Sequence, residues 1–516
     1  MDNTTENNTS KTNIIETNKK HGKTFTMENI LCFFIIVCPL LDVASFLFRN
    51  YFNTFFSIST ILRPIIPIIA IVYIFFKDKI KPQITIVAII YGVYAICHMY
   101  IFHVLKTGCS YGNELRELQY LVNYTFMIIN LFIYIYFFTI KNREAESRDG
   151  EKGLSINKLK ISVLIALTLY VAFMYLALIT GTSSFTYGEA KIGYKGWFES
   201  GNSIGTIMIL SLFMVLPMIG KKNNIVIRIW AFMVTVLAGA YLTTLLGTRT
   251  GLLGFALAIV AYAGLSIIHG LIHNKNVNKK IVLAIVIALG IIGVMVTIFG
   301  SKTIERRKQL QDRESQIYDD MTGQNSHVTG DILSLVKQIK AGTLDENYMS
   351  EDMQKTIMEL YDTANEKQIP YTNMRALQFI YHSTLVKNQN SIPMLLFGNG
   401  YMTHFYEMIF EMEVPAFLYN FGVIGFFLYF MPFLFVALYG VYTVIKNIKK
   451  VTVEFAMLVS GLWLAIIVSF LSGYTFFNSS TMMIIIVLSA LTINGIKDVE
   501  DEKMKIYNRK DVIWKK

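Results

Sequence analysis

Long apolar runs with few charges constrain this chain more than any other feature of its sequence. About 20 consecutive apolar residues let one helix cross the hydrocarbon core of a bilayer, where backbone polar groups must be satisfied within the structure. Such runs recur from residue 29 to residue 496, and only 16% of all residues are charged, compared with about 25% in a typical soluble domain. We therefore predict an all-α polytopic membrane protein.

Twelve runs are long enough to be membrane spans, and they divide the chain into five parts. The predicted spans are 29–48, 54–76, 84–105, 117–140, 158–180, 199–219, 225–245, 250–272, 281–300, 416–445, 452–473 and 476–496. The predicted parts are a cytoplasmic polar tail (1–28), a bundle of nine spans (29–300), a large and mainly helical extramembrane segment (301–413), a bundle of three spans (414–496) and a basic tail (497–516).

The Lys and Arg residues indicate which way the spans run. With the N-terminus inside, the inner segments hold 29 of the 47 basic residues, and the short outer connections hold six. Basic loops are retained on the cytoplasmic side of a bacterial cell membrane. Both termini are therefore predicted to be cytoplasmic and 301–413 to be extracytoplasmic. Because the formal charge of +11 reflects these loops, we expect no nucleic-acid partner.

Two amphipathic helices are predicted within the extracytoplasmic segment. The first begins near Ser350 and covers 353–366, with acidic residues in the first turn, where the helix dipole favours them. The second covers about 373–387 and has an apolar stripe on one face. A different face of the second helix carries Arg375, Gln378 and His382.

Arg249 is the strongest single candidate for binding an anion. It lies in Gly247-Thr248-Arg249-Thr250-Gly251, a break with almost no loop between two apolar spans. A tight turn at the outer surface exposes backbone N–H groups, and the planar guanidinium group matches phosphate oxygens. The alternative is an interfacial anchor that extends to the lipid headgroups. Both interpretations stay open from these residues alone.

A second group of candidates lies close to the tenth span. Arg375 is a second candidate cation, although a solvated helix residue is the alternative for it. Glu411 and Glu413 directly precede the span, and His404 lies a few residues upstream. An acid or a histidine at the edge of a bilayer is suited to act as a general base. The alternative for the two acids is a solvated interfacial turn.

Four polar residues beside other spans are candidates for lining the same outward cavity. Asp42 and Arg63 lie at comparable depth in the first two spans, and we expect a structural ion pair between them. Glu199 and Asn202 begin the sixth span on the outer side, where a helix cap is the alternative explanation.

Metal and cofactor motifs do not account for the remaining polar residues. His98 and His103 lie five residues apart in an aromatic span, and for them packing in the core is favoured over a metal site. The sequence contains no P-loop, dinucleotide fingerprint, HExxH motif or nucleophile elbow. We therefore expect neither a metal nor an organic cofactor.

The order of these motifs resembles the O-antigen ligase and polysaccharide polymerase superfamily, a group of integral-membrane glycosyltransferases that use polyprenyl-diphosphate-linked glycans. The turn at 247–251 is similar to the family's small-residue-Arg turn, and 373–375 followed by 397–400 resembles its loop arginine and trailing Gly-x-Gly. The residues 413–417 and 421–425 are similar to the stretch that enters the next span. The resemblance also covers the arrangement of about twelve spans with one large outer loop before the last few.

The resemblance implies a transferase that works at the outer leaflet during cell-surface polysaccharide biosynthesis. Its implied partners are a polyprenyl-diphosphate-linked glycan donor, a glycan or glycolipid acceptor, membrane lipid and other envelope-polysaccharide assembly proteins. Arg249 and Arg375 would bind the diphosphate and stabilise charge on the leaving group. Glu413, Glu411 or His404 would act as the base. Diphosphate is already a good leaving group, so this chemistry does not require a metal.

The chain departs from the ligase pattern immediately before the tenth span. Ligases of this group place a His-Asn pair there, whereas this chain has Glu411-Met412-Glu413-Val414-Pro415, which is closer to the polymerase branches. We therefore favour polymerisation of repeat units over ligation. A flippase or transporter of lipid-linked oligosaccharide is the alternative, but the candidate residues gather at the outer surface. A scaffold would leave Arg249 unexplained.

Overall fold

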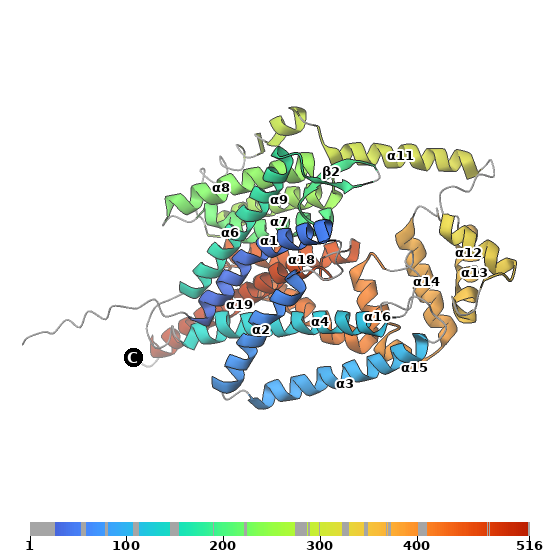
Figure 1. Cartoon of the computed structure of the whole chain (residues 1–516). Helices are drawn as coiled ribbons and strands as arrows, with labels where there is room; N and C mark the ends of the chain where they lie inside the picture. Colours follow the sequence, from blue (N-terminus) through green and yellow to red (C-terminus); the bar gives the residue numbers. More distant parts are fainter. Residues whose placement is uncertain are drawn as a thin grey trace, which may run out of the picture.

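The computed structural model describes residues 26–513 with several gaps. The residues outside the description within this range are 53–57, 78–80, 107–112, 145–153, 189, 221–223, 274–285, 287–288, 291, 299, 322–329, 345–348, 368, 370–372, 401–409, 472 and 474. The described residues are mainly helical, and the helices form one bundle with a smaller group of helices at one end (Figure 1).

The first half of the bundle contains eight α-helices, two of which end in a π-helical turn. They are α1 (Met27–Phe52), α2 (Ile58–Lys77), α3 (Lys81–Lys106), α4 (Glu114–Ile135) with η1 (Tyr136–Lys141), α6 (Leu154–Ile179), α7 (Gly201–Ile219), α8 (Ile225–Ala240) with η2 (Tyr241–Leu245), and α9 (Arg249–Ile272). The second half contains α16 (Glu413–Tyr429), α17 (Met431–Lys446), α18 (Val453–Leu471) and α19 (Ser479–Ile513).

Nine helices in the described part of the chain are long and apolar enough to cross a membrane, and α16 with α17 forms a bent pair that would be a tenth span. This confirms a helical multi-pass membrane protein. The exact number of twelve stays a prediction: α2 lies where the second span was predicted, and much of the predicted span 281–300 is outside the described residues.

The predicted span 416–445 is not one continuous helix. The chain bends by 48° between α16 and α17. Pro432 follows the first residue of α17, and proline has no N–H group with which to continue the hydrogen bonds of α16. Gly422 adds a second irregularity inside α16, with φ of 70°. The tenth span is therefore a broken one.

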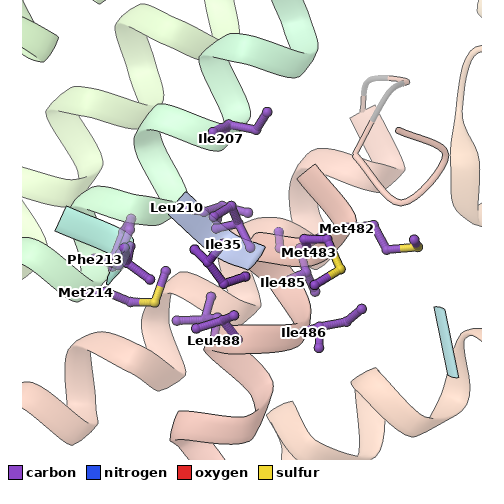
Figure 2. Close-up of a cluster of buried hydrophobic side chains, with 14 of the residues drawn as sticks. Ile35, Ile207, Leu210, Phe213, Met214, Met482, Met483, Ile485, Ile486 and Leu488 are labelled. Carbon is purple, nitrogen blue, oxygen red and sulfur yellow. The ribbon is translucent and has the colours of Figure 1, made fainter. Parts of the chain in front are cut away.

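The core of the bundle lies where α1, α7 and α19 meet. Figure 2 shows Ile35 of α1 beside Leu210 and Phe213 of α7, with Ile485 and Leu488 of α19 completing the cluster. α7 is almost entirely buried. Small residues along α7 let the neighbouring helices approach closely. In a bilayer the lipid tails are as apolar as the side chains, so close packing of this kind, rather than the burial of apolar surface, drives the association of helices.

A short hairpin, which the sequence did not predict, accompanies the helices of the all-α fold. β1 (Ser184–Tyr187) pairs antiparallel with β2 (Ile192–Gly196) in the connection between α6 and α7. The two strands alternate aromatic or aliphatic residues with smaller ones, a pattern typical of strands. The run is too short and too polar to be a span, so a search for long apolar segments passes over it.

The described part of the predicted extracytoplasmic segment contains five helices, and a core separate from that of the bundle joins the second, third and fourth of them. They are α11 (Lys302–Met321), α12 (Gly330–Lys340), α13 (Glu351–Glu366), α14 (Met374–Gln389) and α15 (Ile392–Phe397). The helices predicted at 353–366 and 373–387 are confirmed as α13 and α14. Their apolar faces meet through residues such as Ile357, Leu360 and Leu377. Figure 1 shows α12 to α14 at the end of the molecule opposite the C-terminus.

Candidate active site

Arg249 is the first residue of α9 rather than part of an isolated turn. Gly247 has φ of 82°, a left-handed conformation that glycine adopts without strain. Thr248 caps α9, because its side-chain oxygen accepts a hydrogen bond from the N–H of Gly251 at 3.1 Å. The guanidinium-bearing side chain is exposed and lies at the positive end of the helix dipole. This end of α9 is therefore electropositive.

The hairpin packs directly against the turn that precedes Arg249. Thr186 Oγ1 of β1 donates a hydrogen bond to the carbonyl oxygen of Leu246 at 2.7 Å. Gly193 of β2 has φ of 68°, and a Cβ atom at this position would lie 2.4 Å from the same carbonyl oxygen. Only glycine fits there. The hairpin therefore fixes the turn and brings Tyr187, the last residue of β1, into the site.

α11 packs against the same turn and adds two arginines that the sequence analysis missed. Thr303 Oγ1 donates a hydrogen bond to the carbonyl oxygen of Thr248 at 3.3 Å. One helical turn further on, the guanidinium carbon of Arg306 lies 4.7 Å from the centre of the Tyr187 ring. Arg307 lines a cavity of about 510 Å³ together with Arg249.

Arg375 lies at the start of α14 and contacts Glu411. Its Nε donates a hydrogen bond to Glu411 Oε2 at 3.2 Å, and both side chains are about half exposed. The side chain of Gln378 accepts the N–H of Glu411 at 3.0 Å, which holds this segment against α14. Gln378 and His382, which share the predicted face with Arg375, are buried, and His382 stacks on Phe410.

The charged groups from these elements converge on the hydroxyl group of Tyr187. Burial is the main influence on this group, and it raises the pKa of Tyr187. The opposing influences that lower this pKa come from Arg306, Arg249 and Arg375, whereas Glu411 raises it. Charges that act on one hydroxyl must be near it, because the Coulomb interaction falls with distance and is screened by salt. Arg249 and Arg375 are therefore both within electrostatic range of this one hydroxyl group.

Glu413 has very different surroundings from Glu411. Its side chain is fully buried at the start of α16. Its carboxylate accepts three backbone N–H groups, those of Thr475 at 2.6 Å, Phe476 at 2.7 Å and Phe477 at 2.9 Å. This carboxylate thus ties α16 to the segment that precedes α19. His404, the other base candidate, lies outside the described residues.

Asp42 and Arg63 form the expected ion pair, with Arg63 Nη2 and Asp42 Oδ1 2.5 Å apart. Tyr170 donates a hydrogen bond to Asp42 at 2.8 Å and Ser480 donates one at 2.6 Å. The pair therefore links α1 and α2 to α6 and α19. Arg63 also lines a cavity of about 130 Å³, whose other lining residues include Phe477.

Glu199 and Asn202 are not the cap of α7. Ser200 has this role, because its side chain accepts the N–H of Ser203 at 3.4 Å. Glu199 pairs with Arg49 at 3.1 Å in the last turn of α1, and Asn202 lies in the first turn of α7. That the two residues line a common cavity with Arg249 stays a prediction.

His98 is a buried residue of the core, as expected. Its ring nitrogens lie 2.6 Å from the carbonyl oxygen of Phe397 and 2.8 Å from Glu117 Oε1. His103 is exposed and pairs instead with Glu114. Among the described residues, no three His, Cys, Asp or Glu side chains gather in a way that would hold a metal ion.

The glycines at 398–400 pack on the irregular part of α16. The N–H groups of Asn399 and Gly400 donate hydrogen bonds to the carbonyl oxygens of Tyr419 and Asn420 at 3.0 and 2.9 Å. A Cβ atom at Gly398 would lie 2.1 Å from the carbonyl oxygen of Asn420. These contacts join the end of the outer segment to the helix that begins with Glu413.

The arrangement of the bundle, the outer helices and the arginines agrees with a comparison of the whole sequence. A family model described as O-antigen ligase like membrane protein matches residues 24–499. The chain belongs to this family. No curated protein matches the chain.

Membership in the O-antigen ligase-like family gives the protein a general role in polysaccharide assembly and suggests an enzyme of the glycosyltransferase type. The matched range contains every residue of the site described above. In this O-antigen ligase-like protein, the guanidinium group of Arg306 contacts the ring of Tyr187, and Arg249, Arg375 and Glu411 act electrostatically on its hydroxyl group. Such a site is suited to hold a multiply charged anion beside a proton acceptor.

Proposed function

We propose that this O-antigen ligase-like protein transfers a glycan from a polyprenyl diphosphate carrier to a sugar hydroxyl group. The reaction takes place on the extracytoplasmic side of a bacterial cell membrane, and both chain termini are cytoplasmic. The observation that carries this proposal is that Arg249 and Arg375, which lie on separate halves of the chain, both act electrostatically on Tyr187, and that Arg375 contacts Glu411.

The arginines stabilise the charge that develops on the leaving group. The acceptor hydroxyl oxygen forms a bond to the anomeric carbon, and the bond from this carbon to the diphosphate oxygen breaks. The electron pair of that bond leaves with the diphosphate, and the hydroxyl proton passes to a base. Arg249 and Arg375 bind the diphosphate, and the loss of one such preorganised donor costs about 2.7–4 kcal/mol of barrier.

Glu411 is the base that we favour. Its carboxylate is about half exposed and contacts Arg375, so an acceptor sugar can reach it beside the bound diphosphate. Glu413 is buried and already accepts three N–H groups, which suits it to hold the backbone in place. His404 stays a candidate base.

The cavity between α9 and α11 suits the lipid part of the donor. Arg249 and Arg307 line it together with Leu252, Leu253, Ile304 and Leu310. Leu253 is 61% exposed and Ile304 is 53% exposed. A polyprenyl diphosphate has the same division into an anionic head and an apolar chain, so we assign this cavity to the chain next to the diphosphate.

Polymerisation of repeat units is the reaction that we favour over ligation. The acidic stretch Glu411-Met412-Glu413 stands where ligases have a His-Asn pair. In a polymerase, donor and acceptor are both lipid-linked glycans, and the chain grows by transfer to the next unit.

The decisive experiment uses purified protein with a lipid-diphosphate-linked oligosaccharide and no nucleotide sugar. We expect the wild type to lengthen or transfer the glycan and Arg249→Ala to be folded but at least about 100-fold slower. Arg116→Ala, at an exposed arginine in the first turn of α4, is the matched control and should keep full activity. Movement of the substrate across a liposome bilayer without transfer would instead identify a flippase.

A further inference from the structure

Arg306 has donors that no protein group satisfies within the described part of the chain. Its Nε and Nη1 atoms are buried and lack a hydrogen-bond partner among these residues. A buried charged donor without a partner is costly, because the group has lost its water and gained nothing in return. These two nitrogens therefore have unused hydrogen-bonding capacity in the described structure.

The ring of Tyr187 positions this guanidinium group. The 4.7 Å separation between the guanidinium carbon and the ring centre is a cation–π contact, which restrains the planar group above the ring. The contact joins α11 to the hairpin, and Figure 1 shows α11 running beside β2. Arg306 is thus held on the same side of the molecule as the turn that carries Arg249, against which α11 also packs.

In the proposed reaction, the leaving diphosphate carries more negative charge than Arg249 and Arg375 can balance, so a third cation would stabilise it further. Glu411 neutralises part of the charge of Arg375, because the two side chains are in contact. A diphosphate that links a lipid to a sugar gains one negative charge when the bond to the sugar breaks. Arg306 forms no ion pair with any acidic side chain in the described residues, so none of these residues balances its charge at close range.

We propose that Arg306, stacked on Tyr187, is a third diphosphate-binding residue that stabilises the charge gained by the leaving group. A guanidinium group has the planar donor geometry that suits phosphate oxygens. The inference rests on the proposed function, because it concerns the same substrate.

The test measures binding of farnesyl diphosphate and farnesyl monophosphate to the full-length protein in detergent. Arg306→Ala should weaken the affinity for the diphosphate about tenfold, which corresponds to about 1.4 kcal/mol, and should reduce the preference for diphosphate over monophosphate. Lys308→Ala changes an exposed cation on the same helix and should leave both affinities unchanged. Arg249→Ala serves as the positive control for loss of binding.

The outcomes separate this inference from the proposed function. If Arg249→Ala weakens binding but Arg306→Ala does not, the role of Arg306 is wrong and the proposed function stands. If the wild type does not bind the diphosphate better than the monophosphate, both proposals fail. If Arg306→Ala does not fold, the same binding measurement on Tyr187→Phe and Tyr187→Leu tests the proposal. Only Tyr187→Leu removes the aromatic ring, so only this variant should lose the preference for diphosphate over monophosphate. An equal preference for diphosphate over monophosphate in Tyr187→Phe and Tyr187→Leu would overturn the proposal.

Discussion

Glu411 and Glu413 are two residues apart, yet their carboxylates have opposite surroundings. The first is exposed beside an arginine, and the second is buried and accepts three backbone N–H groups. Hydrogen bonds to a charged acceptor are among the stronger ones in proteins, and a buried N–H that loses its acceptor is costly. We therefore assign Glu413 a role in stability and Glu411 a role in the transfer reaction.

This difference predicts how the two acids respond to substitution. Glu413→Ala should destabilise the protein by about 3 kcal/mol, because three buried N–H groups lose their acceptor. Glu411→Ala should leave the free energy of unfolding nearly unchanged and abolish most of the transfer activity. Thermal unfolding of both variants in detergent checks the first part. Equal melting temperatures would show that the hydrogen bonds of Glu413 are not a major source of stability.

At the scale of elements, the hairpin and α11 enclose the turn before Arg249 from two directions. Thr186 and Thr303 donate hydrogen bonds to the carbonyl oxygens of Leu246 and Thr248. The carbonyl oxygen of Thr248 also accepts the N–H of Leu252 in the first turn of α9, so the hairpin and α11 add to the hydrogen bonds that position the arginine that begins this helix.

Two glycines of the hairpin region test this arrangement. Gly193→Ala places a Cβ atom 2.4 Å from the carbonyl oxygen of Leu246 at a positive φ, so the turn must shift. We expect a loss of activity of at least about tenfold, with destabilisation of about 1–3 kcal/mol. Gly188→Ala is the matched control, because a Cβ atom there meets nothing within 4 Å. The idea is wrong if both variants keep wild-type turnover.

At the scale of the whole molecule, the site lies at one end of a bundle whose other end carries the C-terminus (Figure 1). The helices that supply the charged groups come from distant parts of the chain. The ion pair of Asp42 and Arg63 joins α1 and α2, and its serine partner belongs to α19. Such links fix the helices that support the outer segment.

The position of this site relative to the membrane leads to a topology prediction. In intact cells, a thiol reagent that cannot cross the membrane should label Lys308→Cys in α11 but not Lys450→Cys, which lies before α18 in a predicted inner loop. Permeabilised cells should label both positions. The native chain contains four cysteines, and its labelling in the same experiment is the background that is subtracted. Labelling of Lys450→Cys alone in intact cells would reverse the proposed orientation.

The predicted helices α13 and α14 were accurate because an amphipathic stripe and a cap are local features. α14 begins at Met374, one residue after the predicted start, and Asn373 caps it. The sequence patterns predicted neither the hairpin nor a role for Arg306 in the site. The run Glu305-Arg306-Arg307-Lys308 has the composition of a solvated helix face, and nothing in it indicates a tyrosine more than 100 residues earlier.

The sequence by itself determined that this is a helical membrane protein. The bilayer acts on each segment separately, so length and apolarity are sufficient to identify a span. The ion pair of Asp42 and Arg63 was predicted from their depth in two neighbouring spans, whereas only the tertiary structure decided the partners of Glu413 and Arg306. Glu413 finds its partners at Thr475, Phe476 and Phe477, and Arg306 stacks on Tyr187, because packing between distant helices sets these contacts. No local pattern encodes such a pairing, since it depends on how the helices cross.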